Sequence, residues 1–203
     1  MKIIVIEGPD RVGKATQAKR LKEYLAHKGK RVEIVEVPIK RGVTYDAIYW
    51  MLGNGLAKKL PRLFQTLQFL NRWTFQKVEL PKLASSNDFV IFDRWSLSTN
   101  VYGLAEGLGP EFVNYFYSNL RRPDYTFVLL GDSHQHEAED VYERDTALQK
   151  RVRILYDQWA KNHPDECHVI NCQNPKELIT AEMVGVLRAS GVLDVKDEYI
   201  FLS

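Results

Sequence analysis

Residues near the start of the chain have the types and spacing of a loop that binds phosphate. Gly8, Gly13 and Lys14 fit the pattern G-x-x-x-x-G-K between an apolar run and a segment with helical periodicity. The glycines allow a tight turn whose backbone N–H groups form an anion nest at a helix N-terminus, and the lysine can reach the β and γ phosphates. Ala15 breaks the pattern, because a serine or threonine there normally offers its hydroxyl to magnesium. Two interpretations stay open: an ATP site that holds its metal another way, or a loop that keeps only its fold.

Two charged residues inside this loop suggest further chemistry. Arg11 could contact the transferring phosphoryl group, and Asp10 could accept hydrogen bonds from a hydroxyl of a second substrate. The alternative is that the two only pair with each other at the surface. Thr16 cannot simply replace the missing hydroxyl, because one helical step turns it by ~100° from Ala15. The predicted ATP-binding loop consists of Gly8, Pro9, Asp10, Arg11, Val12, Gly13, Lys14, Ala15 and Thr16.

A second pair of charged residues follows an apolar run in the middle of the chain. Asp93 and Arg94 would end a strand at the carboxyl edge of the sheet, where open α/β folds bind ligands. Arg94 can clamp phosphate oxygens, and Asp93 can hold magnesium directly or through water. Phosphate oxygens and water supply most ligands of such an ion, so Asp93 could compensate for the hydroxyl missing at Ala15. The alternative is a plain surface ion pair.

Strands and helices that alternate along the chain must position these residues. The β-branched and aromatic runs without strict alternation are typical of strands covered on both faces. We expect strands at 2–7, 31–37, 88–93, 124–130 and 167–171. We expect helices from Lys14 to a stop at Gly29, at 61–85 with a kink or end at Pro81, at 141–162 and at 174–189. The pattern predicts a doubly wound α/β fold: a five-stranded parallel sheet with helices on both faces, in a single domain over 1–203 with a short lid about 131–140.

Composition narrows the function classes. The chain has 203 residues, 45% of them hydrophobic, and a formal charge of +2, which is too weak to indicate a nucleic-acid or anionic-membrane partner. No apolar run approaches the ~20 residues that span a bilayer, and the N-terminal run lacks a cleavage site. The spacing of Cys167 and Cys172 fits no common zinc pattern, so we expect two reduced thiols in a cytoplasmic, soluble protein.

Four segments, in order, resemble the thymidylate kinase family of P-loop nucleoside-monophosphate kinases. They are EGPDRVGKATQAKRL, FLNRW, FDRWSLSTNVY and DVYERDTALQKRV, and together they cover most of the chain. The resemblance implies ATP as phosphate donor, Mg²⁺, a homodimer and conversion of dTMP to dTDP. The stretch 131–140 has no arginine or lysine, which is typical of the branch with an arginine in the phosphate loop. His134 and His136 are then solvated loop residues rather than metal ligands.

The resemblance also implies roles for single residues. The catalytic residues would be Lys14, Arg11, Arg94 and Asp10, with Asp93 at the metal. The acceptor deoxynucleotide would contact Asp10, Lys40, Gln68, Phe69, Arg72, Arg94, Ser98, Thr99, Tyr102 and Gln149. Tyr102 would disfavour a 2′-hydroxyl, unless it is a core tyrosine, and either Lys40 or its neighbour Arg41 could be mere solvated charge.

One departure from the family pattern concerns the base. The family places a phenylalanine one turn before the arginine that corresponds to Arg72, and here that position holds Gln68. Either Phe69 stacks on the base after a slight helix rotation, or Gln68 lines the base and the preferred base differs. A kinase for another or modified deoxypyrimidine monophosphate, and a nucleotide-binding protein without turnover, therefore remain alternatives.

Overall fold

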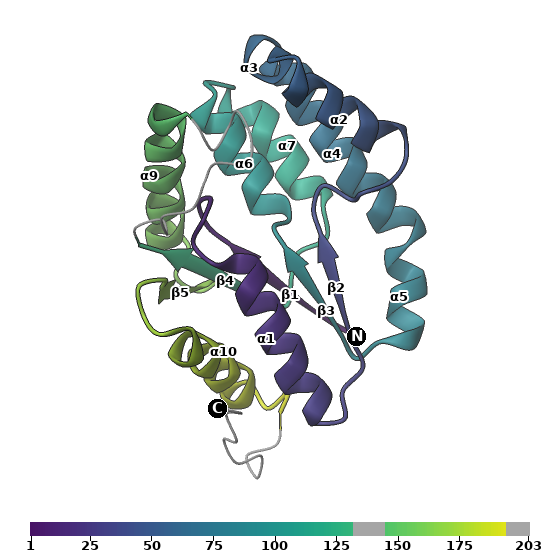
Figure 1. Cartoon of the computed structure of the whole chain (residues 1–203), viewed down its shortest axis with the longest axis vertical. Helices are drawn as coiled ribbons and strands as arrows, with labels where there is room; N and C mark the ends of the chain where they lie inside the picture. Colours follow the sequence, from purple (N-terminus) through teal and green to yellow (C-terminus); the bar gives the residue numbers. More distant parts are fainter. Residues whose placement is uncertain (132–144, 194–203) are drawn as a thin grey trace.

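The computed structural model describes residues 1–131 and 145–193, and their centre is a parallel sheet. Five strands lie in the order β2-β3-β1-β4-β5, as Figure 1 shows. The bounds are β1 (Lys2–Glu7), β2 (Val32–Glu36), β3 (Phe89–Asp93), β4 (Tyr125–Leu130) and β5 (His168–Asn171). Each strand falls inside its predicted range, and the predicted doubly wound α/β class is confirmed. The loops after β1 and β3 leave the same edge of the sheet side by side, because these strands are neighbours.

Helices cover both faces of the sheet (Figure 1). Helices α1 (Lys14–His27) and α10 (Lys176–Ala189) pack on one face. Four helices cover the other face: α4 (Pro61–Val78), α6 (Ser96–Ala105), α7 (Pro110–Asn119) and α9 (Thr146–Asn162). The remaining helices are α2 (Val43–Gly53), α3 (Leu56–Lys59) and α5 (Leu80–Ser86).

The central strand shows why both faces must be covered. Ile4 and Ile6 are buried in the core formed with α1 and α10. Ile3 and Val5 are buried in a different core, on the other side of the strand. Successive side chains of a strand point to opposite faces, so an uninterrupted apolar run produces two cores. The two layers hold the carboxyl edge of the sheet rigidly beneath the loops that carry the charged residues.

Several helix predictions can be compared with the structure. The break expected near Pro81 in the helix at 61–85 is present, since α4 ends at Val78 and α5 begins at Leu80 with Pro81 in its first turn. Helix α9 begins at Thr146, where the Asp145 side chain accepts a hydrogen bond from the Leu148 N–H at 2.9 Å. The rest of the expected start, 141–144, and positions 132–140 of the expected lid lie outside the described residues, as do His134 and His136.

The prediction missed α6 because this helix is buried nearly all round. In its sequence, SLSTNVYGLA, small polar residues are buried together with apolar ones. The helix therefore has no exposed polar face, and the sequence shows no amphipathic period from which to predict it. Cys167 and Cys172 are buried and neither forms a disulfide bond, which confirms the expected thiols. Among helices of the described ranges, none combines the length and hydrophobicity that crossing a bilayer requires.

Candidate active site

The phosphate-binding pattern forms the turn between β1 and α1. Gly8 has φ 140°, and a Cβ there would lie 2.4 Å from the Leu129 carbonyl oxygen, so only glycine fits. Gly13 has φ 85° immediately before α1, and Arg11 has φ 61°. Backbone in this region is costly for a non-glycine residue, and such conformations cluster at functional sites. The turn lines a cavity of about 860 Å³ from Asp10 to Gln17.

Lys14 lines this cavity and is itself buried. Its Nζ donates a hydrogen bond to the Pro9 carbonyl oxygen at 2.6 Å. Burial lowers the pKa of Lys14 to about 8, and repulsion from Arg94 adds to this, against attraction from Asp93 and Asp10. The lysine is therefore a cation that an incoming polyphosphate would stabilise.

Asp93 lies at the same cavity, next to Ala15. Its carboxylate accepts no hydrogen bond from residues 1–131 and 145–193, and burial raises the pKa of Asp93 against the opposing effects of Lys14 and Arg94. Glu36 is the register partner of Asp93 on the neighbouring strand and lines the same cavity. The described part of the chain has no cluster of three or more metal-ligating side chains. One or two carboxylates beside a phosphate site is the donor set that Mg²⁺ uses in nucleotide enzymes, so these residues fit that ion.

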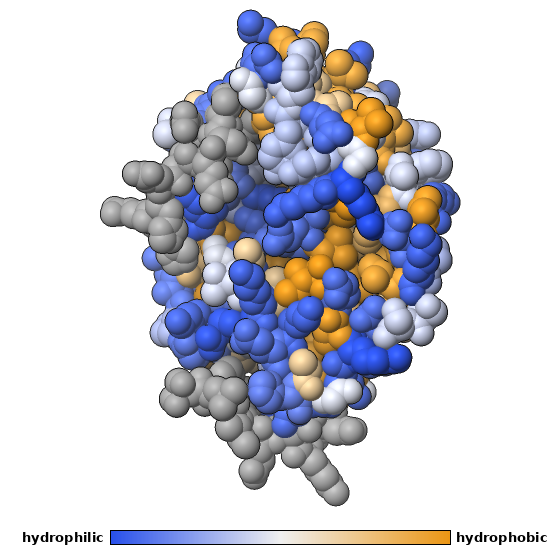
Figure 2. All heavy atoms as spheres, turned by 45° about the vertical axis from the view of Figure 1, so that its right-hand side comes forward, coloured by the Kyte–Doolittle hydropathy of each residue, from blue (hydrophilic) through white to orange (hydrophobic). Residues whose placement is uncertain are grey.

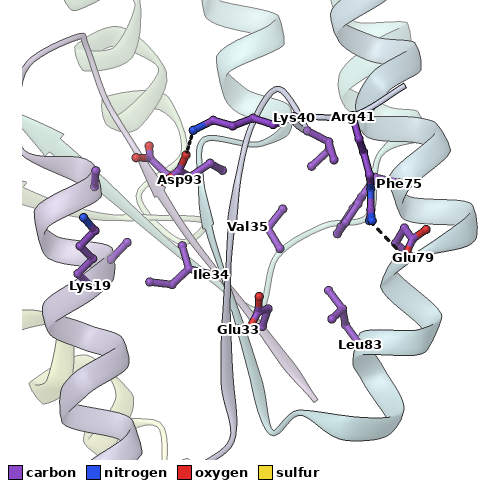
Figure 3. Close-up of a pocket in the computed structure, with 14 residues that line it drawn as sticks. Lys19, Glu33, Ile34, Val35, Lys40, Arg41, Phe75, Glu79, Leu83 and Asp93 are labelled. Atoms are coloured by element: carbon purple, nitrogen blue, oxygen red, sulfur yellow. Dashed lines mark ion pairs between the residues drawn. The ribbon is translucent and has the colours of Figure 1, made fainter. Parts of the chain in front are cut away.

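A groove of about 610 Å³ extends from Asp93 along the edge strand β2 (Figure 3). Hydrophobic residues reach the surface in the middle of this face, as Figure 2 shows. On the rim, Lys40 pairs with Glu36 at 2.5 Å and Arg41 pairs with Glu79 at 3.2 Å. Lys40 lines both the groove and the phosphate cavity. Arg41 lines the groove but not the phosphate cavity. Of the two predicted basic residues, Lys40 is therefore the one placed at the phosphate cavity.

A network of hydrogen bonds joins the loop to three other elements through Asp10. Arg94 pairs with Asp10 Oδ1, and Arg94 Nη1 also donates to the Gly8 carbonyl oxygen at 2.9 Å. The Tyr102 hydroxyl and the Gln149 amide donate to Asp10 Oδ2 at 2.8 and 2.6 Å. Burial alone would raise the pKa of Asp10, but Arg94, Lys14 and these hydrogen bonds outweigh it and lower the pKa. The alternative, in which Asp10 only pairs with its loop neighbour Arg11 at the surface, differs from the structure, where Asp10 pairs with Arg94.

Glu7 holds the turn after β3 and the start of α6 in place. The sequence predicted no role for this residue. This fully buried carboxylate accepts hydrogen bonds from the Trp95 N–H at 2.8 Å, the Ser98 hydroxyl at 2.6 Å and the Tyr156 hydroxyl at 2.9 Å. Arg94, between β3 and this anchored turn, has φ 70°. An acidic residue that ends an apolar strand was the available signal, because a buried acid needs several donors.

A second cavity, of about 240 Å³, opens on the other side of Asp10 and Arg94. Seven of the predicted acceptor residues line it: Asp10, Gln68, Arg72, Arg94, Ser98, Thr99 and Tyr102. Burial lowers the pKa of Arg72 to about 10, which leaves it protonated at neutral pH. Its Nη1 donates to the backbone carbonyl and to Oε1 of Gln68 at 2.9 and 2.8 Å.

Comparison with known proteins decides the family. The model of the family described as thymidylate kinase matches residues 6–183. The chain belongs to the thymidylate kinase family. It is 33% identical over 154 residues to the thymidylate kinase of African swine fever virus, covering 76% of this chain and 62% of the viral protein. It is 30% identical to that of Dinoroseobacter shibae, covering 92% and 96% of the two chains, and 27% identical to that of Dictyostelium discoideum, covering 90% and 83%.

Within this thymidylate kinase family member, the structure places the two alternatives for the base, Phe69 and Gln68, in different surroundings, and Phe69 lies away from the acceptor cavity. Its ring stacks on Phe116 with centroids 4.4 Å apart, and it is buried in the core. One residue along a helix turns the side chain by ~100°, so Phe69 and Gln68 face different surroundings. Gln68 is the residue that lines the acceptor cavity.

Several lining residues of this kinase were not predicted. Tyr49 and Leu52 of α2 and Phe64 of α4 line the acceptor cavity. Cys172, Asn174, Lys176 and Ile179, around the start of α10, line the phosphate cavity. The spacing of Phe64, Gln68 and Arg72 at successive turns was a usable signal for Phe64, whereas the others come from elements that only tertiary packing brings to the site.

Proposed function

We propose that the chain transfers the γ-phosphoryl group of ATP to dTMP, giving dTDP and ADP. The observation that carries this proposal is the meeting of two cavities: the phosphate cavity and the acceptor cavity share Asp10 and Arg94 in their walls. A donor polyphosphate on one side and an acceptor phosphate on the other would meet at these two residues. The family match supports thymidine monophosphate as the acceptor.

The proposed mechanism needs no general base. A phosphate oxygen of the acceptor is already anionic, so it attacks the γ-phosphorus directly while the bond to the β–γ bridging oxygen breaks and ADP leaves. Catalysis is then positioning and neutralisation of charge. We assign Lys14 and Arg11 to the transferring group and Arg94 to the space between donor and acceptor, since Arg94 is anchored to Gly8 on the donor side.

The remaining residues would orient the acceptor. Asp10 would receive the 3′-hydroxyl of the sugar in place of one of its present hydrogen bonds from Tyr102 and Gln149. The Tyr102 ring would then lie against the sugar and disfavour a 2′-hydroxyl. Lys40 would exchange Glu36 for the acceptor phosphate, which is feasible because the pair is about half-exposed and therefore weak.

Magnesium is the proposed cofactor, with Asp93 as its protein anchor. When bound, the ion would neutralise charge on the β and γ oxygens. Asp93 fits this role because its carboxylate has no hydrogen-bond partner in the described chain and faces the cavity beside Ala15. The missing hydroxyl at Ala15 would then weaken metal binding without abolishing it.

We also propose a cytoplasmic homodimer. Leu63, Leu70 and Trp73 of α4 and Tyr115 of α7 expose between 38% and 62% of their surface. Tyr115 lies against Phe69, which adjoins Leu70, with ring centroids 6.4 Å apart. An apolar surface built from two neighbouring helices is typical of a subunit interface. The thiols of Cys167 and Cys172, which form no disulfide, are consistent with a reducing compartment.

The experiment that tests the reaction is a transfer assay with ATP and magnesium across the natural nucleoside monophosphates. We expect dTMP to be phosphorylated with the highest kcat/KM and the Lys14→Ala variant to be inactive. Transfer to none of the nucleotides would overturn the proposed function. A better acceptor than dTMP would change the substrate but keep the reaction.

A further inference from the structure

Glu7 immediately precedes the phosphate loop but lines neither of the two cavities. Its carboxylate is fully buried. The Oε1 atom accepts from the backbone N–H groups of Trp95 and Ser98 at 2.8 and 3.2 Å, and Oε2 accepts from the hydroxyls of Ser98 and Tyr156 at 2.6 and 2.9 Å. A buried acid is costly unless such bonds compensate it, whereas an apolar side chain would end the apolar strand β1 without this cost. The carboxylate therefore indicates a requirement beyond packing.

Helix α6 is capped by this carboxylate from β1. The helix has its own N-cap residue, Trp95, whose side chain makes no capping hydrogen bond. The N–H of Ser98 is the third in the helix, and this is a group that a capping side chain usually satisfies. Glu7 accepts from it across 91 positions of sequence, and its negative charge is favourable at the positive end of a helix. Glu7 thereby fixes where α6 begins relative to the phosphate loop.

Arg94 lies just before this cap in a strained backbone conformation. Its φ is 70°, which is costly for arginine and persists only where the surroundings impose it. The N–H of Arg94 donates to the Ile6 carbonyl oxygen at 3.1 Å, and the next N–H, of Trp95, donates to Glu7. Two consecutive residues of β1 therefore hold the turn that contains Arg94.

The side chain of Arg94 is also linked to Glu7, through the hydroxyl of Ser98. Arg94 Nη1 donates to Ser98 Oγ at 3.3 Å. A guanidinium only donates and a carboxylate only accepts, so the single hydroxyl proton of Ser98 points to Glu7 and its lone pairs face Arg94. Glu7 thus determines the orientation of the hydroxyl that receives the guanidinium.

We propose that Glu7 is a positioning residue for phosphoryl transfer, which fixes both the backbone turn and the guanidinium of Arg94 between the donor and acceptor cavities. This inference rests on the proposed function, which assigns Arg94 to the space between the two phosphates. Arg94 lines both cavities, so a displacement of its guanidinium by ~1 Å would misplace the charge that the transfer needs. The effect should fall on kcat and not on ATP binding, because Lys14 and the glycines of the loop are unaltered.

Glu7→Gln tests the proposal with almost no change in side-chain volume. In one orientation of the amide its nitrogen faces the two backbone N–H groups, and in the other it faces the hydroxyls of Ser98 and Tyr156. Either orientation disrupts the cap or the contact with Ser98. We expect kcat to fall about 100-fold and KM for ATP to stay within about twofold of the parent. An unaltered kcat in this variant would overturn the proposal.

A double-mutant cycle shows whether Glu7 acts through Arg94. Arg94→Lys keeps a positive charge but lacks the planar fork that contacts Ser98 and Gly8. Adding Glu7→Gln to this variant should lower kcat by less than about threefold, because the group that Glu7 positions is already gone. The same factor in both backgrounds would mean that Glu7 acts elsewhere, and the proposal would be wrong.

Asn114→Ala is the matched control for the stability of α6. The Asn114 Oδ1 atom accepts a hydrogen bond from Asn100 of α6 at 2.8 Å, and neither residue lines the two cavities. This variant should lower the melting temperature while kcat stays within about twofold of the parent. A loss of kcat as large as in Glu7→Gln would show that the rate only follows the stability of α6, against the proposal.

Ser98→Ala decides the question if Glu7→Gln does not fold. It removes only the hydroxyl between Glu7 and Arg94, and alanine is the most favourable residue in a helix. We expect kcat at saturating dTMP to fall about tenfold in the parent and to change little in Arg94→Lys. An unchanged kcat, or an equal loss in both backgrounds of an active enzyme, would overturn the role of Glu7 alone. A parent chain that transfers no phosphate would overturn the proposed function and this role with it.

Discussion

The ammonium of Lys14 is held by the carbonyl oxygen of Pro9, five residues earlier in the same loop, at 2.6 Å. A bound polyphosphate would have to draw the lysine away from that carbonyl. In its place Lys14 would gain a full negative charge, which compensates burial far better than a carbonyl dipole does. The exchange should therefore raise the number of protons that Lys14 binds.

ATP binding should take up protons in mildly alkaline solution. The pKa of Lys14 is lowered to about 8 from 10.5, so at a pH between these values the folded chain without ligand binds fewer protons than the unfolded chain. The contribution of this group to the free energy of unfolding therefore rises with pH across that window. Phosphate favours the charged lysine, so calorimetry at pH 9 in two buffers of different ionisation enthalpy should show net proton uptake. Equal uptake in Lys14→Met would assign the proton to another group.

Arg11→Gly should reduce transfer by about 1000-fold, because an arginine on the transferring phosphoryl group is worth that much in related chemistry. Glycine adopts φ 61° more readily than arginine, so the melting temperature should change little. Steady-state kinetics and a melting curve of one preparation test both statements, and Arg11→Lys, which keeps a charge, is the matched variant. An intact rate in Arg11→Gly would remove the arginine from the mechanism.

The magnesium dependence of the rate should change on substitution of Asp93 and change little on substitution of Ala15, the loop position without a hydroxyl. Asp93→Asn is expected to lower the rate and to shift the magnesium curve to higher concentration. Ala15→Ser should change little or tighten metal binding by about 1 kcal/mol for one added contact. Asp88→Asn serves as control, because Asp88 lies at the opposite end of β3 and pairs with Arg31. A magnesium curve untouched by Asp93→Asn would place the ion elsewhere.

The proposed dimer should dissociate when a charge is placed on α4. Leu70→Glu puts a carboxylate in the apolar surface formed with Trp73 and Tyr115, and burying an unpaired charge there is costly. Leu178→Glu makes the same change on α10, where the leucine is 47% exposed compared with 38% for Leu70. Light scattering after size exclusion should give a monomer for Leu70→Glu and a dimer for the parent and for Leu178→Glu. A parent chain that is already monomeric would disprove the dimer.

Local sequence was enough to predict the residues that share one turn or strand. Gly8, Gly13 and Lys14 lie within six positions of each other, so their spacing determines the phosphate turn almost without reference to the rest of the chain. The same holds for Asp93 and Arg94, because parallel strands bring their carboxyl ends to one edge of the sheet. Helices α2, α3 and α6 were not predicted. Helix α6 is buried on nearly every side, and α2 and α3 are short, so none of them shows a clear amphipathic period in the sequence.

The α/β fold, the phosphate loop and the charged residues at the strand ends could be predicted from the sequence, because each depends on neighbours a few positions apart. Tertiary structure decided which partners those residues have. Asp10 pairs with Arg94, 84 residues away, and not with its neighbour Arg11. The rotation of α4, set by the packing of Phe69 against Phe116, turned Gln68 to the acceptor cavity. A one-residue difference in helix phase is about 100°, which local propensity does not resolve but core packing does.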